Sequence, residues 1–199
     1  MRVLVVGATG TIGRAVAAAL EERHEVLSVS HRSGPLTVDL ADSASIARLY
    51  ERVGRVDAVA CAAGATRFRP LSELSEEDFR FTLMHKLLGQ INLVRLGIRH
   101  LADGGSFTLI SGTLATRPTR GGAAISVANA GVEAFVASAA LELPRGIRVN
   151  AVSPGWVAET LRKMGHRPEG ATPATAVARA FVEAIEGEAT GTVIEPGGA

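Results

Sequence analysis

The sequence has few of the features that mark extracellular, disulfide-linked or metal-binding proteins. Its single cysteine, Cys61, excludes an intrachain disulfide and fits a reducing compartment. Cys61 ends an expected buried strand, which favours a packed thiol over a nucleophile. The five histidines are scattered, without the spacing of a metal-ligand cluster. We therefore expect no metal site.

Strong charge and long apolar runs are also missing. The 21 basic and 20 acidic residues leave a net charge of +1, and no basic run stands out. Neither nucleic acid nor an anionic membrane is therefore an expected partner. The longest apolar stretches are only strand-length, and Met1 leads directly into a strand without a signal-peptide pattern. We expect a cytoplasmic protein whose residues 1–199 form one domain.

Strand and helix patterns alternate along the whole chain. Strands are expected at 2–6, 25–30, 36–38, 56–61, 106–110, 148–152 and 191–194. Helices are expected at 14–22, 43–53, 75–101, 123–143 and 172–186. This order predicts an α/β fold of the doubly wound Rossmann type, with a mostly parallel seven-stranded sheet and helices on both faces.

A glycine-rich turn follows the first strand and precedes the first helix. It reads Gly7-Ala-Thr-Gly10-Thr-Ile-Gly13. In this context, glycines allow the backbone to approach a pyrophosphate held at a helix N-terminus. The alternative is a purely structural tight turn. The turn predicts cofactor contacts from five residues: Gly7, Thr9, Gly10, Thr11 and Ile12.

The end of the second expected strand indicates which dinucleotide binds. NAD sites place an acidic residue about twenty positions beyond the glycines to bond the ribose 2′-hydroxyl. Here the segment reads Ser30-His31-Arg32-Ser33 and contains no carboxylate. His31, Arg32 and Ser33 could hold a 2′-phosphate through charge-assisted hydrogen bonds, which favours NADP over NAD. The alternative is an ordinary exposed basic loop.

Residues 121–157 contain Ala128-Asn129-Ala-Gly-Val-Glu and, further on, Pro154-Gly155-Trp156-Val157. With these motifs, the segment resembles the catalytic helix and following strand of the short-chain dehydrogenase/reductase family. The resemblance implies a nicotinamide cofactor and a small carbonyl substrate. It also implies further cofactor positions: Asp39, Leu40, Ala62, Ala63, Gly64, Pro154, Gly155 and Val157. The family's threonine after the Pro-Gly loop is displaced, because Glu159 stands there and Thr160 follows.

The four catalytic residues of that family are all replaced. Ile125 and Asn129 occupy the tyrosine and lysine positions, and Gly112 occupies the serine position, flanked by Ser111. Lys86 occupies the asparagine position, so lysine and asparagine have exchanged places. Isoleucine cannot titrate, and an amide carries no charge to lower a neighbour's pKa. Lys86, Ser111 and Asn129 are therefore the candidate catalytic residues, while Lys86 could instead be an ordinary helix lysine.

In the family the two long helices pack against their two-fold mates. The expected helix 123–143 carries small residues that allow close approach: Ala130, Gly131, Ala134 and Ala137. The resemblance therefore implies a homodimer or homotetramer, and the alternative is that these residues pack within one chain.

Three functions remain open on this evidence. The first is an NADP-dependent oxidoreductase with a rebuilt proton relay that uses Lys86 with Ser111 or a water. The second is a nucleotide-binding module that senses NADP(H), and the third is a silent subunit that pairs with an active relative. Loss of a general acid costs roughly 10²- to 10⁴-fold in rate, which weakens catalysis without forbidding it.

Overall fold

The computed structural model describes residues 1–197, so the last two residues of the expected domain lie outside the described part. These residues form one parallel sheet with the strand order β3-β2-β1-β4-β5-β6-β7. The strands are β1 (Arg2–Val6), β2 (Glu25–Ser30), β3 (Leu36–Thr37), β4 (Val56–Cys61), β5 (Leu101–Ile110), β6 (Arg148–Val152) and β7 (Val193–Ile194). The predicted seven-stranded Rossmann architecture is confirmed.

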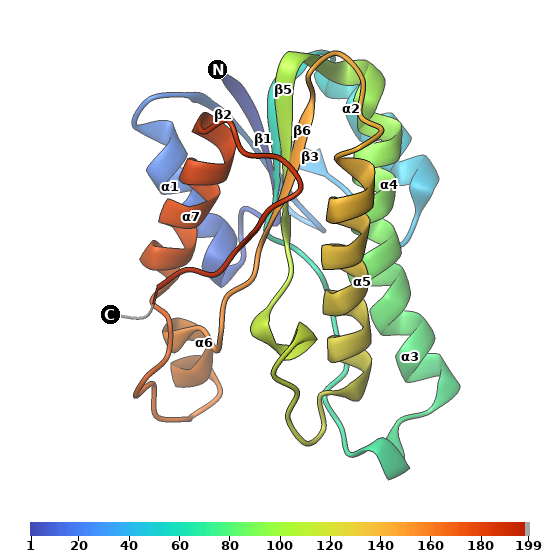
Figure 1. Cartoon of the computed structure of the whole chain (residues 1–199), viewed down its shortest axis with the longest axis vertical. Coiled ribbons are helices and arrows are strands. Elements are labelled where there is room, and N and C mark those ends of the chain that lie inside the picture. Colours follow the sequence, from blue (N-terminus) through green and yellow to red (C-terminus); the bar gives the residue numbers. More distant parts are fainter. Residues whose placement is uncertain (198–199) are drawn as a thin grey trace.

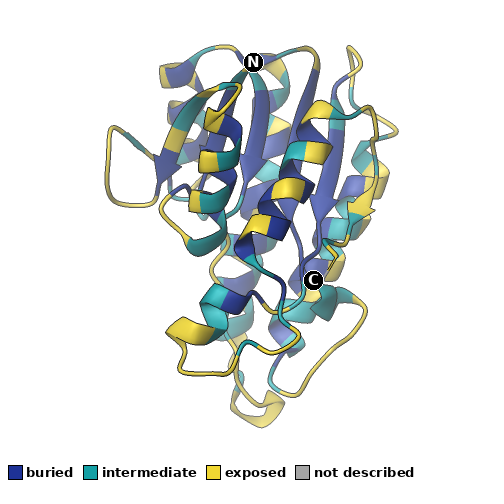
Figure 2. Cartoon of the chain, turned by 90° about the vertical axis from the view of Figure 1, so that its left-hand side faces the viewer, coloured by how far each residue is buried: buried dark blue, intermediate teal, exposed yellow. Residues whose placement is uncertain are grey.

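Helices cover both faces of the sheet (Figure 1). On one face lie α1 (Thr11–Glu21) and α7 (Ala174–Glu186), and on the other α2 (Ser43–Val53), α4 (Gly89–Gly97) and α5 (Ala123–Ala139). Alternate residues of each strand enter one of two apolar cores, as β1 shows with Leu4 and Val6 on one side and Val3 and Val5 on the other. Figure 2 shows the consequence, buried strands behind helices whose outer faces are exposed.

The expected continuous helix 75–101 is wrong in detail. It is divided into α3 (Glu76–Thr82), a π-helical turn η2 (Leu83–Leu88), α4, and a 3₁₀ turn η3 (Ile98–His100). The chain then enters β5 at Leu101, before the expected residue 106. A π turn of only six residues is too short to alter the apolar pattern of the longer helical segment, so the sequence does not reveal it. Such turns are frequent at functional sites, and this one carries Lys86.

Other boundaries differ by a few residues. Helix α1 begins at Thr11 instead of 14, α5 ends at Ala139 instead of 143, and α7 begins at Ala174, directly after Pro173. Three short elements were not expected: η1 (Leu71–Glu73), η4 (Thr113–Ala115) and α6 (Ala158–Lys163). Among the described residues, no helix combines the length and apolar character needed to cross a membrane.

Candidate functional site

The glycine turn brings β1 and α1 into unusually close contact. A Cβ atom at position 13 would lie 2.0 Å from the carbonyl oxygen of Gly7, a distance that no side chain tolerates. Gly13 therefore allows α1 to begin against the strand end, with Gly10 as its N-cap. The first backbone N–H groups of α1 thus stand at the carboxyl edge of the sheet, where an anionic group is stabilised by the helix dipole.

Two adjoining cavities open along this edge. The larger is about 660 Å³ and the smaller about 370 Å³. They share the loop that follows β4, because Ala62, Ala63 and Gly64 line both. The hollow therefore has two compartments that meet at the end of the central strand β4.

Most of the expected cofactor residues line this hollow. The larger cavity is lined by Gly7, Thr9, Gly10, His31, Arg32, Asp39 and Leu40. The smaller one is lined by Ile12, Pro154, Gly155 and Val157. Thr11 and Ser33 line neither of the two. The hydroxyl oxygen of Thr11 accepts a hydrogen bond from Lys163 Nζ at 2.8 Å, and the backbone N–H of Ser33 donates to Ser30 Oγ at 3.0 Å.

Two aromatic residues in the larger cavity were not expected from the sequence. Phe81 and His85 pack ring against ring, with centroids 4.3 Å apart. His85 Nδ1 lies 4.0 Å from Asp39 Oδ1. The guanidinium of Arg67 covers the Phe81 ring at 3.7 Å from its centroid, a cation–π arrangement. Their spacing is that of any helix face, so the pattern of residues contained no signal for a site.

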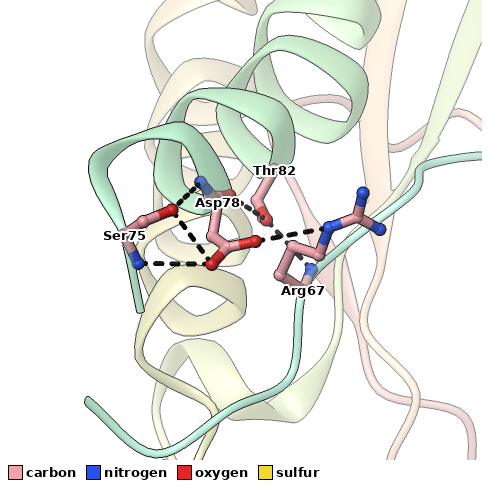
Figure 3. A network of polar contacts seen from close by, with 4 residues as sticks. All are labelled: Arg67, Ser75, Asp78 and Thr82. Atoms are coloured by element: carbon pink, nitrogen blue, oxygen red, sulfur yellow. Dashed lines mark hydrogen bonds and ion pairs between the residues drawn. The ribbon is translucent and has the colours of Figure 1, made fainter. Parts of the chain in front are cut away.

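Arg67 also fastens the loop after β4 to α3 (Figure 3). Its Nε lies 3.5 Å from Asp78 Oδ1, and its backbone N–H donates to Thr82 Oγ1 at 3.0 Å. Asp78 completes a capping box with Ser75. The backbone N–H of Ser75 is the main cause that lowers the pKa of Asp78 below its usual value. The loop that joins the two cavities is thereby held in place.

Lys86 is buried where β5 ends. Its Nζ donates to the carbonyl oxygens of Ile110 and Ser111, each at 3.3 Å, and the residue is only 7% exposed. Burial lowers the pKa of this ammonium from 10.5 to about 8. The side chain passes over Gly64, where a Cβ would lie 2.9 Å from Lys86 Cγ. Lys86 lines the smaller cavity, so this buried lysine borders the space that a bound molecule would occupy.

Asn129 hydrogen bonds to Gly112, the residue that follows Ser111 at the end of β5. Its Nδ2 donates to the carbonyl oxygen of Gly112 at 3.0 Å, while its buried Oδ1 accepts no hydrogen bond from any residue of the described chain. Ile125 lines the cavity four residues earlier. The only tyrosine, Tyr50, lies in the core and donates its hydroxyl to Leu93 O at 2.7 Å. The chain therefore has no tyrosine that could act in this cavity.

The hydroxyl of Ser111 is directed toward α5. Ser111 Oγ donates to Glu133 Oε1 at 2.7 Å, with Asn129 O at 3.2 Å as a second acceptor. Its single proton is thus committed to a carboxylate. Glu133 was not among the expected site residues.

The short helix α6 contains both Glu159, which stands where the resemblance expects a threonine, and the following Thr160. Glu159 Oε2 accepts a hydrogen bond from the backbone N–H of Ala174 at 2.9 Å, which stabilises the start of α7. Thr160 lines the smaller cavity in its place. Nearby, Trp156 packs edge-on against Phe68, with ring centroids 5.9 Å apart. This aromatic pair joins the loops after β4 and β6 beside the cavity.

Comparison with known proteins agrees with this geometry. Residues 7–185 match the family model described as enoyl-(acyl carrier protein) reductase. The solved structure of the protein lin1944 from Listeria innocua is 46% identical, with a TM-score of 0.94 over 98% of both chains. A small-chain dehydrogenase solved in complex with NADPH is 30% identical, with a TM-score of 0.86 over 98% of this chain and 95% of that one.

A curated relative shows a more partial match. The 2,3-dihydro-2,3-dihydroxybenzoate dehydrogenase of Escherichia coli (strain K12) is 31% identical over 125 residues, which are 59% of this chain and 50% of that enzyme. The chain thus spans about half the length of this relative. The family model, by contrast, extends from the glycine turn through most of α7. On this evidence, together with the sheet and the glycine turn, the chain belongs to the short-chain dehydrogenase/reductase family of oxidoreductases.

Proposed function

We propose that the protein is an NADP-dependent oxidoreductase that reduces a small carbonyl compound and uses Lys86 as its proton donor. The observation that carries this proposal is the buried Lys86 ammonium at the wall of the smaller cavity, where it is held by two backbone carbonyls. The NADPH complex of a 30% identical small-chain dehydrogenase supports the choice of cofactor.

The residues of the hollow fit a nicotinamide dinucleotide. The glycine turn would hold the pyrophosphate through its backbone N–H groups, and Arg32 lines the same cavity at the end of β2. A guanidinium there suits a 2′-phosphate. In the other compartment, the orphaned Oδ1 of Asn129 is a buried acceptor that a ribose hydroxyl would satisfy. Asn129 would then bind the cofactor from the position that lysine has in the family.

When bound, the cofactor supplies a hydride to the carbonyl carbon. The carbonyl oxygen gains negative charge as that carbon is reduced, and a positioned acid must protonate it. Lys86 uses two of its three N–H groups on Ile110 O and Ser111 O, which leaves one for the substrate. With a pKa of about 8, most of the amine is protonated at neutral pH. The neutral amine that results takes its next proton from water.

The smaller cavity limits the substrate to a compact molecule. Its volume of about 370 Å³ must contain the reacting end of the cofactor as well as the substrate. Apolar side chains, among them Leu114, Ile125 and Trp156, line it together with the hydroxyls of Thr113 and Thr119. We infer a small, largely apolar aldehyde or ketone.

We also propose a homo-oligomer assembled through α5 and the neighbouring π turn. Ala130, Ala134 and Ala137 are exposed on α5, and Val127 is 51% exposed beside them. Met84 and Leu88 in η2 are exposed as well. Gly131 behaves differently, because it packs within the chain against Leu87.

The cytoplasm remains the proposed location, based on the single buried cysteine.

Cofactor binding and turnover test the proposal separately. Calorimetry with NADPH should show binding, and a panel of small aldehydes and diketones should accelerate NADPH oxidation. Binding with no turnover on any member of the panel would contradict the catalytic proposal and favour the sensing function. Failure to bind either NADPH or NADH would overturn both.

A further inference from the structure

Glu133, on α5, accepts hydrogen bonds from residues at the ends of two neighbouring strands. The same carboxylate oxygen, Oε1, accepts a hydrogen bond from Ser111 Oγ at 2.7 Å and from Ser153 Oγ at 2.8 Å. Ser111 follows β5 directly, and Ser153 follows β6 directly. Both serines are buried, at 4% and 2% exposure. Hydrogen bonds to an ionised acceptor are about twice as strong as neutral ones, so this clamp fixes both strand ends to α5.

The two clamped segments also hydrogen bond to each other and border the smaller cavity. Ser111 N–H donates to Val152 O at 2.8 Å, and Thr113 N–H donates to Pro154 O at 2.9 Å. Gly112, Thr113, Pro154 and Gly155 line the cavity. The clamp therefore lies directly behind one wall of the site.

Glu133 fixes the Ser111 side chain against α5 through its hydroxyl. The next position also lies against α5, since a Cβ at 112 would be 2.9 Å from Asn129 Nδ2. Both Ser111 and Gly112 line the smaller cavity. The Ser111 carbonyl in turn accepts from Lys86 Nζ. Glu133 is thus one hydrogen-bonded residue away from the ammonium, although it lines neither cavity.

We propose that Glu133 is a positioning residue, which orients the Ser111–Thr113 and Ser153–Gly155 segments so that Lys86 and the nicotinamide end of the cofactor are correctly placed. The expected effect of Glu133 on turnover rests on the proposed function. The expected effect of Glu133 on the strand ends is independent of that function and can be measured in the free protein. An amide oxygen can still accept from both serines. A methyl group leaves the buried Ser153 hydroxyl without an acceptor and leaves Ser111 Oγ only the more distant Asn129 O.

Hydrogen exchange of the free protein is the first test. Glu133→Ala should accelerate exchange of the Ser111 and Thr113 amides by about tenfold or more, and Glu133→Gln by much less. Val136→Ala, a buried change on the same helix, controls for lost stability and should leave these two amides slow relative to their neighbours. Glu142→Gln, at an exposed position, controls for the lost charge. Equal local exchange in Glu133→Ala and Val136→Ala would overturn the proposal.

Cofactor affinity and turnover are the second test. Glu133→Ala should weaken NADPH binding and lower kcat by about tenfold each, with most of both restored in Glu133→Gln. If Glu133→Ala does not fold, Ser153→Ala removes one donor only and should give a smaller loss of the same kind. Wild-type affinity and kcat in a folded Glu133→Ala or Ser153→Ala protein would overturn the positioning role. Failure of the unmodified chain to bind NADPH would instead overturn the proposed function, and the exchange measurement would still decide the clamp.

Discussion

Lys86 Nζ lies 3.3 Å from the carbonyl oxygen of Ser111, at the point where β5 ends and the smaller cavity begins. One residue further, Asn129 Nδ2 holds the carbonyl oxygen of Gly112. Lys86 and Asn129 thus hold neighbouring carbonyl groups of the same strand end, one from the π turn and the other from α5. The cation at this cavity therefore lies on the π turn, while α5 carries a neutral amide.

Arg32 is expected to determine the preference for NADP. Arg32→Ala should weaken NADPH binding by about tenfold or more, because a charge-assisted bond to the 2′-phosphate is lost, and should leave NADH binding unchanged. Calorimetric titration of both cofactors measures this. Arg55→Ala removes an exposed arginine at the amino end of β4 and serves as the control. Equal affinities of the unmodified protein for NADPH and NADH would refute the preference.

Lys86 should reduce stability in the pH range where it is charged. Its pKa falls from 10.5 to about 8 on folding, so the penalty is complete below pH 8 and disappears as the pH rises toward 10.5. Lys86→Met should therefore raise the free energy of unfolding at neutral pH by up to roughly 3 kcal/mol. The loss of the two Lys86 hydrogen bonds reduces this gain. Urea unfolding at several pH values measures the difference, with Lys163→Met at an exposed position as control. A destabilised Lys86→Met protein at neutral pH would contradict the prediction.

The sequence was sufficient to predict the sheet and to place most of the expected site residues at its carboxyl edge, because both depend on local patterns. The glycine turn and the run from His31 to Arg32 follow strands that are apolar enough to recognise. Glu133 and His85 could not be recognised, since a lone polar residue on a helix has no pattern and its role depends on which strand ends it meets. Ser33 forms a local turn with Ser30 that its composition does not reveal.

Restoring the family's catalytic residues should require several changes together. Gly112→Ser alone should be harmful, because its Cβ would lie 2.9 Å from Asn129 Nδ2. Ile125→Tyr alone leaves a tyrosine with a pKa of ~10, since no ammonium lies beside it on α5. The triple variant with Asn129→Lys should show more NADPH-dependent reductase activity than any single variant. A steady-state assay of all four proteins tests this, and single variants as active as the triple one would argue against it.

The proposed oligomer should be sensitive to charge on the exposed face of α5. Ala134→Arg places a long cation where close approach is expected, and should shift sedimentation at micromolar concentration toward the monomer. Ala18→Arg, on the exposed face of α1, should have no effect. A monomeric unmodified protein would refute the assembly outright.

The central claim is that Lys86 donates the proton, and the pH dependence of single-turnover NADPH oxidation tests it most directly. With a pKa of about 8, the rate in the unmodified protein should fall about tenfold per pH unit above that value, as the ammonium is lost. Lys86→Met should be slower by roughly 10²- to 10⁴-fold with no such fall, while retaining NADPH binding. Lys86→Arg should be slow but constant in rate up to about pH 10, because a guanidinium does not titrate there. A Lys86→Met protein that matches the unmodified rate and pH profile would contradict the account.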